Sequence, residues 1–432
     1  MAVRTSSSGG SAELSPRPAV PPDGLKIAFL TPGLPPEGGG IGSYTEKTSR
    51  ALAARGHEVH VLVPGIPRLH LEIIDAVRIH RIPTPRARPM VLAQTRAMAV
   101  ALRRLGPFDI VQASEWGGLA WWFSHIAPTP LVTRLATPHF MIEELNRVPW
   151  AQRRRQSVSR WLERSQARRS ARVISPARVL ADRVARRWRI EAGAITLVPT
   201  GISLPRPELG PVPAELQGVE YVLYFGRLEE RKGVDTWVEA LPAVLRSRPS
   251  LHAVFVGEDM GMGGRSFEER ARERCPDQSG RLHFLPAMSH ARLFPIVAAA
   301  RLVVMPSHWE SLANTCLEAM ALSRTVVATS GSGFSEVITD QVDGFLVPPG
   351  DATALAARVS DLADDDVRLA RIGRAARRRA EDFDLDTMVD RLLTVYAELL
   401  SAPRRPRNGG DGTASPELRE LSGRRHGVRA RV

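Results

Sequence analysis

Short, uninterrupted apolar runs alternate with longer helical patterns along most of the chain. The first run, Leu25 to Leu30, is apolar at nearly every position, which is typical of a parallel strand buried on both faces. A Gly/Pro-rich loop from Pro32 to Tyr44 leads into a helical stretch that ends at Arg55, with Gly56 in the position that favours a left-handed C-terminal residue. The next run, His57 to Val63, completes a βαβ unit.

The same alternation continues to residue 199 and restarts at residue 221. Four more strands are expected in the first half, at 109–112, 130–133, 172–175 and 194–199. Six are expected in the second half, at 221–225, 251–256, 282–285, 302–305, 325–328 and 344–347. We therefore predict an α/β architecture of two doubly wound Rossmann-like domains, whose strand ends face each other across one cleft.

Composition sets the expected domain boundaries. Residues 205–219 are rich in Pro, Glu and Gly, which is typical of a linker, so we place the two domains at 24–205 and 206–385. Residues 1–23 and 402–432 have no apolar periodicity and are predicted to be disordered tails, the second of them basic.

The chain carries no recognisable export or membrane-spanning signal. The first 23 residues lack the apolar core of a secretory signal, and no uncharged apolar run reaches the roughly 20 residues that a bilayer crossing needs. Two cysteines are too few for a disulfide scaffold. These features predict a cytoplasmic protein.

The net charge of +13 favours anionic partners. The basic residues are spread over helices and tails, without aromatic interleaving or zinc-finger spacing, so no specific nucleic-acid partner is expected. One stretch, Trp150 to Trp188, combines dense Arg with Trp at intervals. Two interpretations stay open: a helical face in weak contact with an anionic membrane, at its inner surface, or an ordinary exposed helix pair.

Two charged clusters follow predicted strands of the second half. Arg227 and Lys232 come after the strand at 221–225 and can donate charge-assisted hydrogen bonds to a leaving diphosphate. Glu310 lies in the loop after the strand at 302–305 and Glu318 in the helix that follows, with Asn314 as the expected helix cap. Two carboxylates there can accept hydrogen bonds from sugar and ribose hydroxyls. Spacing alone is equally consistent with solvated surface charges.

Five segments, taken in order, resemble the retaining glycosyltransferases of family 4, which have the GT-B fold. The segments are GGGIGSY at 38–44, FGRLEERKGVD at 225–235, VFVGED at 254–259, PSHWESLANTCLEAMA at 306–321 and SEVITDQVDGFLVPPGD at 335–351. The resemblance covers residues 25–400. It implies transfer of a hexose from a nucleotide-diphosphate sugar to an unidentified acceptor, by front-face attack in which the leaving diphosphate helps to deprotonate the acceptor hydroxyl. It also implies that a helix at 386–401 crosses back to the first domain.

The resemblance assigns a role to each matching residue. Arg227 and Lys232 match the diphosphate-binding pair, Glu310 matches the acid at the sugar, and Glu318 matches the acid at the ribose hydroxyls. We take Arg227, Lys232 and Glu310 as catalytic. The remaining expected donor-binding residues are Gly39, Gly40, Gly226, Pro286, Ala287, Ser311, Leu312, Ala313 and Asn314.

The sequence also departs from the family pattern. Ala136 stands where a histidine near the sugar is usual, and His139 is the candidate substitute. Ser311 to Ala313 replaces the usual Gly-Phe-Gly, and Ser323 to Thr325 replaces Gly-x-Pro. Two further replaced positions are Thr200 and Ser203. These departures leave the donor sugar open, with weakened activity as an alternative.

No metal and no cofactor are expected, because the cationic pair takes the role of a divalent ion. The acidic run at 364–366 is interpreted as part of a solvated helix. Two alternatives from other classes remain. One is a basic polyanion-binding protein with a degenerate transferase fold. The other is a nicotinamide-dependent oxidoreductase, which would need a third glycine at a step that residues 38–42 do not provide.

Overall fold

The computed structural model describes residues 24–35, 38–66, 70–84, 89–146, 148–191, 193–203, 209–312 and 314–402. The two predicted tails therefore lie outside the described residues, apart from Ala402, and so does Ala313 of the expected donor site.

An eight-stranded sheet forms the centre of the first half. Its described strands are β1 (Lys26–Leu30), β2 (Glu58–Ile66), β3 (His70–Ile74), β4 (Val77–Pro83), β5 (Ile110–Ser114), β6 (Leu131–Arg134), β7 (Arg172–Ser175) and β8 (Ile195–Leu197). They lie in the order β3-β4-β2-β1-β5-β6-β7-β8. All pairs are parallel except β3 with β4.

The hairpin of β3 and β4 was not predicted. The turn between the two strands places Asp75 and Ala76 at positive φ (49° and 62°), a conformation that is uncommon for residues other than glycine. β3 is also largely exposed, with Leu71 at 51% and Ile73 at 64%, so burial does not impose the apolar run that marks the other strands.

A six-stranded, all-parallel sheet forms the centre of the second half. Its strands in the described part of the chain are β9 (Glu220–Phe225), β10 (Leu251–Val256), β11 (Leu282–Leu285), β12 (Leu302–Met305), β13 (Val326–Thr329) and β14 (Phe345–Val347). The order is β11-β10-β9-β12-β13-β14, the doubly wound order of a Rossmann sheet. All six predicted strands are present, each within one or two residues of its expected bounds.

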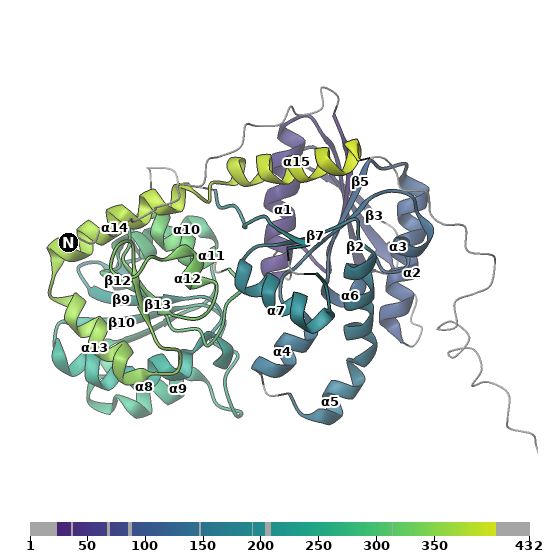
Figure 1. The fold of residues 1–432 in the computed structure, drawn as a ribbon. Coiled ribbons are helices and arrows are strands. Elements are labelled where there is room, and N and C mark those ends of the chain that lie inside the picture. The colour runs from purple at the N-terminus through teal and green to yellow at the C-terminus, as the bar shows by residue number, and fades with distance from the viewer. Residues whose placement is uncertain are drawn as a thin grey trace, which may run out of the picture. The chain divides into compact units, whose positions relative to one another are not determined.

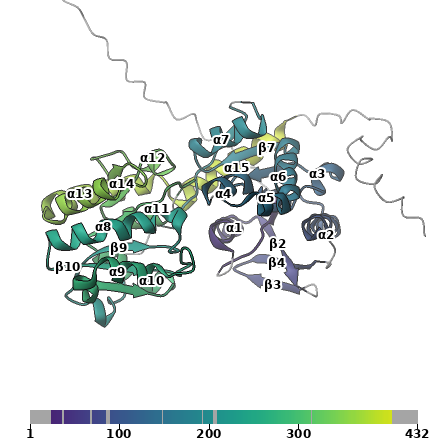
Figure 2. The same cartoon turned by 90° about the horizontal axis from the view of Figure 1, so that it is seen from below.

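Helices cover both faces of each sheet (Figures 1 and 2). Those of the first half are α1 (Gly39–Ala54), α2 (Met90–Leu105), α3 (Phe123–Ile126), α4 (His139–Leu145), α5 (Trp150–Arg155), α6 (Ser157–Arg169) and α7 (Arg178–Trp188). Those that follow are α8 (Val234–Ser247), α9 (Phe267–Arg274), α10 (His290–Ala299), α11 (Asn314–Ala321), α12 (Phe334–Val337), α13 (Ala352–Ala363), α14 (Asp366–Glu381) and α15 (Leu385–Ser401). Buried apolar clusters line both faces of both sheets, so the prediction of two Rossmann-like α/β domains is confirmed.

The last helix, α15, packs against the first sheet rather than the second. Its residues Leu392 and Tyr396 are buried in the same apolar cluster as Ile27 and Phe29 of β1. Tyr396 also donates a hydrogen bond of 2.7 Å from its hydroxyl to Oε1 of Gln112 on β5. The C-terminal helix therefore completes the core of the first half (Figure 1).

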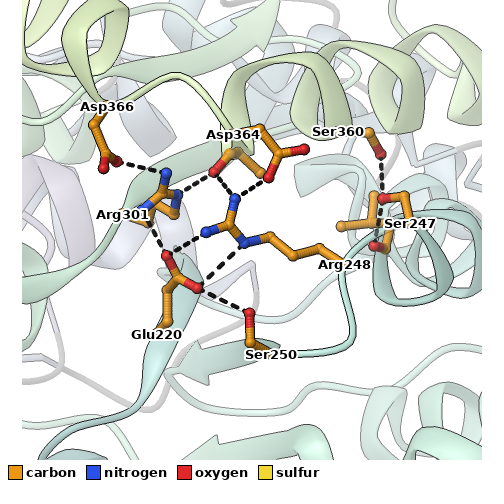
Figure 3. A network of polar contacts seen from close by, with 10 residues as sticks. Glu220, Ser247, Arg248, Ser250, Arg301, Ser360, Asp364 and Asp366 are labelled. Atoms are coloured by element: carbon orange, nitrogen blue, oxygen red, sulfur yellow. Dashed lines mark hydrogen bonds and ion pairs between the residues drawn. The ribbon is translucent and has the colours of Figure 1, made fainter.

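An ion-pair network joins the start of β9 to the junction of α13 and α14 (Figure 3). Glu220 accepts hydrogen bonds from Arg248 (2.9 Å) and Arg301 (2.5 Å), while Asp364 pairs with Arg248 and Asp366 with Arg301 (2.6 Å). The middle residue of the acidic run caps α14. The side chains of Asp364 and Asp366 nevertheless remain 72% and 82% exposed, so the prediction of a solvated acidic run is confirmed, and its ion pairs are surface links between α13, α14 and the sheet.

Candidate active site

A cleft of about 1090 Å³ lies at the carboxyl ends of strands from both sheets. In the first half it is lined by the ends of β1 and β5, and in the second half by the ends of β9 and β12. Each of these pairs marks the point where the strand order reverses, and open α/β sheets bind their ligands at such points. The topology therefore brings the loops after four strands to one place.

The second half supplies a cation and carboxylate pair to this cleft. Lys232 ends a short 3-10 turn after β9, and its ammonium group donates a hydrogen bond to Oε1 of Glu310 in the loop after β12. Nη1 of Arg231 lies 3.9 Å from the same oxygen, and the Ser307 hydroxyl donates to it at 3.2 Å. Burial alone would raise the pKa of Glu310, but the two neighbouring cations outweigh it and hold the pKa below its usual value. Glu310 is therefore ionised, although it is only 6% exposed.

Arg227 lines the same cleft with a freer side chain. Its backbone is fixed, since the Tyr224 hydroxyl donates to the Arg227 carbonyl oxygen at 2.7 Å, and Gly226 before it takes a φ of 131°. The guanidinium group is 56% exposed and has one weak ion pair, 3.4 Å from Glu229. Arg227 and Lys232 thus lie on one loop beside Glu310, as the resemblance implied, with Arg227 available to a ligand.

Glu318 lies in α11 and faces basic side chains from both halves. Its carboxylate is 3.7 Å from Nζ of Lys47 on α1 and 3.4 Å from Nε2 of His290, and the residue is 6% exposed. The sequence analysis missed Lys47. The sequence feature that could have identified Lys47 is its position in the predicted helix directly after the glycine segment.

The loop before α11 lines the cleft through Ser311 and Leu312. Asn314 also lines it, but as the first residue of α11 rather than as its cap, and its Oδ1 atom has no hydrogen-bond partner. The prediction that Asn314 caps this helix is therefore wrong.

The glycine segment forms the start of α1 rather than a loop before it. Gly39 and Gly40 lie in the first turn and line the cleft, and a Cβ atom added to either would meet nothing within 4 Å. Gly42 is different, because an added Cβ would lie 2.7 Å from the carbonyl oxygen of Gly33. The first two glycines therefore leave room for a ligand, whereas Gly42, which the sequence analysis did not single out, lets the helix pack on the preceding loop.

Three of the expected site residues do not line the cleft. Pro286 and Ala287 follow β11 and are exposed, but neither is among the residues that surround the cavity. His139 begins α4, where its ring stacks on Trp116 at 3.9 Å and its Nδ1 pairs with Glu163. Trp116 lines the cleft and His139 does not, so the structure places His139 behind its wall.

A buried carboxyl supports the wall at Ala136, the position where the family usually has histidine. Both oxygens of Glu115 accept a hydrogen bond from the Ala136 backbone N–H at 2.9 Å. Burial, together with the charge of Glu163, raises the pKa of Glu115 to about 8. The sequence analysis missed Glu115, although an acid directly after a buried strand was a visible signal.

A chain of polar contacts runs from α15 to the cleft wall. Beyond the bond between Tyr396 and Gln112, the Gln112 amide donates to the Tyr44 hydroxyl at 3.0 Å, and the Arg134 guanidinium lies 3.7 Å from the Tyr44 ring centre. Arg134 donates in turn to Thr200 Oγ1 at 2.7 Å. Thr200, a departure from the family pattern, therefore orients a buried arginine in this wall.

The other departures lie elsewhere. Ser323 takes a φ of 58°, the left-handed region that favours the glycine usual at this position, and the Thr325 hydroxyl donates to the Leu369 carbonyl oxygen within the second core.

Among the described residues no group of three or more His, Cys, Asp or Glu side chains is placed to hold a metal ion. No helix in the described ranges is long and apolar enough to cross a membrane.

Two family models match the chain, one on each half. Residues 38–206 match the model described as Glycosyltransferase Family 4, and residues 219–365 match the model described as Glycosyl transferases group 1. The gap between them falls on the predicted linker.

Curated relatives align over most of their length. The D-inositol 3-phosphate glycosyltransferase of Streptomyces avermitilis is 29% identical over 400 residues, which cover 85% of this chain and 85% of the relative. The glycogen synthase of Mycobacterium tuberculosis is 28% identical over 406 residues, covering 85% and 93% respectively.

Solved structures share the fold. Sucrose-phosphate synthase from Thermosynechococcus elongatus superposes with a TM-score of 0.72 at 24% identity, over 87% of this chain and 99% of that one. The Anabaena protein HepE in complex with UDP-glucose superposes with a TM-score of 0.67 at 20% identity, over 87% and 99%.

Proposed function

Because this chain belongs to the group 1 and family 4 glycosyltransferases, we propose that it transfers a hexose from a nucleotide-diphosphate sugar to an acceptor hydroxyl, with retention at the anomeric carbon. The observation that carries the proposal is the meeting of Lys232, Arg227 and Glu310 in one cleft at the strand-order reversals of both sheets. The oxidoreductase alternative is set aside, since both matching models are transferases.

The charges of the second half suit a nucleotide-diphosphate sugar. Arg227 and Lys232 supply charge-assisted hydrogen bonds to the diphosphate oxygens, where negative charge develops as the glycosidic bond breaks. Glu310, kept ionised by its neighbours, accepts hydrogen bonds from sugar hydroxyls, and Glu318 accepts them from the ribose. The complex of HepE with UDP-glucose shows that a protein of this fold binds such a donor.

The first half faces the acceptor in this proposal. Gly39 and Gly40 leave space for the donor phosphates and the acceptor at the start of α1. No carboxylate of the first half lines the described cleft. The proposed reaction is a front-face attack without an enzymic nucleophile, in which the leaving diphosphate takes the acceptor proton. Neither a metal nor a cofactor has a role in it.

The decisive experiment compares Arg227→Ala and Lys232→Ala with Arg374→Ala, which removes an exposed arginine of α14. Donor turnover should fall by at least about a hundredfold in the first two variants, as for the loss of a charged transition-state contact, and should be unchanged in the third. Thermal melting should show all three folded.

A panel of nucleotide diphosphates and their sugars in the same melting assay would identify the base, because a bound ligand raises the melting point by mass action. Turnover close to that of the wild type in both cleft variants would contradict the proposal. If no nucleotide sugar bound at all, and heparin bound in a strongly salt-dependent way, the polyanion-binding alternative would replace it.

A further inference from the structure

We propose that the tip formed by α5 and the start of α6 is a docking surface for an anionic lipid bilayer. The proposal concerns binding alone, so it stands or falls separately from the donor chemistry.

The surface of this segment carries an excess of positive charge. Residues 150–169 contain seven arginines and a single acidic residue, Glu163, whose side chain is fully buried against His139 and the Gly117 N–H. The described side chains of α5 and α6 therefore expose no carboxylate. Most arginine-rich helices carry acidic neighbours that neutralise them, as α9 does with Glu268 and Arg272.

The arginines of α5 and the start of α6 divide into an inner and an outer set. Arg153 donates to the carbonyl oxygens of Val148 and Glu143, and Arg160 donates to the Glu143 carboxylate at 2.5 Å. These bonds hold the short helix in place. Arg154 and Arg155 are exposed instead.

The tip also exposes an indole ring. Trp150, the first residue of α5, is 68% exposed, and the guanidinium of Arg154 lies 5.6 Å from its ring centre. An amphipathic ring beside cationic side chains matches the boundary between lipid headgroups and acyl chains. Trp161 of α6 is also 43% exposed, and its ring centre lies 5.2 Å from that of Trp121. Two exposed indoles are not the series of stacked aromatic rings that single-stranded nucleic acids require, which favours lipid over nucleic acid.

The tip lies close in the chain to residues that line the cleft. α4 leads directly to α5, and Ile142 and Asn146 at its end line the cleft. Trp150 follows Asn146 by four residues, a reach of at most about 14 Å. The short connection would therefore keep a bilayer bound at α5 near the first-half side of the cleft, where a lipid-linked acceptor could enter.

The test is co-sedimentation of the full chain with vesicles of phosphatidylcholine, with or without phosphatidylglycerol, at low and high salt. The wild type should pellet only with the anionic vesicles. Trp150→Ala leaves the net charge unchanged and should weaken partitioning about tenfold, the loss expected for one buried aromatic side chain. The double variant R154E/R155E should weaken it at least thirtyfold, given about 1 kcal/mol for each arginine at an anionic surface.

Two matched controls separate the tip from general charge and general apolar exposure. R374E/R378E reverses two exposed arginines of α14, and Ile73→Ala removes a side chain that is 64% exposed on β3. Both should pellet like the wild type, and melting should show every variant folded. The proposal is overturned if Trp150→Ala pellets like the wild type, or if R374E/R378E loses as much binding as R154E/R155E. It is also overturned if RNA, but not anionic vesicles, retains the wild type.

Discussion

At the residue scale, the sequence predicted the charges of the site better than their partners. Arg227, Lys232, Glu310 and Glu318 all line one cleft. The neighbours that set their ionisation and position, Arg231 beside Glu310 and Lys47 beside Glu318, were not predicted. Such pairs join residues far apart in the chain, and spacing within a motif carries no information about them.

Gly40 and Gly42 at the start of α1 should differ in how substitution by alanine affects stability. Gly42→Ala should lower the free energy of unfolding by about 1–3 kcal/mol, because its Cβ would lie 2.7 Å from a backbone oxygen that cannot move freely. Gly40→Ala should leave stability unchanged or raised by about 0.5–1 kcal/mol, since its Cβ meets nothing.

Urea unfolding of both variants measures these changes. Donor turnover measured alongside should fall in Gly40→Ala despite its intact fold, because the added methyl group occupies cleft space. Equal stability losses in the two variants would show that the distinction between packing and ligand glycines is wrong.

At the element scale, continuous apolar runs located twelve of the fourteen described strands, whereas exposed β3 and buried β4, whose sequence mixes apolar with basic residues, were not predicted. A strand that is buried on both faces needs apolar residues at successive positions, and this continuous run is what makes it recognisable in the sequence. β4 is nevertheless anchored to the sheet by a polar contact: His80 on β4 lies 2.9 Å from His60 on β2, ring nitrogen to ring nitrogen, and His60 bonds in turn to Glu58.

This histidine pair predicts a pH-dependent stability. Burial and the neighbouring His60 lower the pKa of His80 from its ordinary 6.5 to about 4. Between these two pH values the unfolded chain binds more protons than the folded chain, so the free energy of unfolding should fall as the pH drops from about 6.5 towards 4. The loss attributable to His80 is at most about 3 kcal/mol.

The measurement is urea unfolding at a series of pH values for the wild type, His80→Gln and His70→Gln. His80→Gln removes the titrating group and should flatten the slope below pH 6.5. His70 is exposed at the start of β3, so its replacement should leave the slope as it is. A slope that His80→Gln does not change would exclude the buried pair as its source.

At the scale of the whole molecule, the C-terminal helix belongs to the first half in space and follows the second half in sequence. Tyr396 on α15 begins the polar chain through Gln112 and Tyr44 to Arg134 in the cleft wall. The end of the chain therefore supports both the first core and one wall of the site.

Tyr396→Phe tests this long-range support. The change leaves the buried Gln112 Oε1 without its donor and should cost about 1–3 kcal/mol. Amide hydrogen exchange should accelerate in β1 and β5 as well as in α15. Arg391→Ala, at an exposed position of the same helix, should change stability by less than about 0.5 kcal/mol. Acceleration confined to α15 would mean that the helix is not integral to the first core.

The sequence by itself determined the two sheets, their parallel strands and the identity of the charged cleft residues, because each of these follows from local burial patterns or from motifs read within a few residues. Only the tertiary structure decided which charges meet. The pairing of Lys232 with Glu310 spans 78 positions, the contact of Lys47 with Glu318 joins the two halves, and the exposed acidic run at 364–366 pairs with two distant arginines, Arg248 and Arg301. Such contacts depend on strand order and helix packing, which bring distant segments together without leaving a periodic trace in the chain.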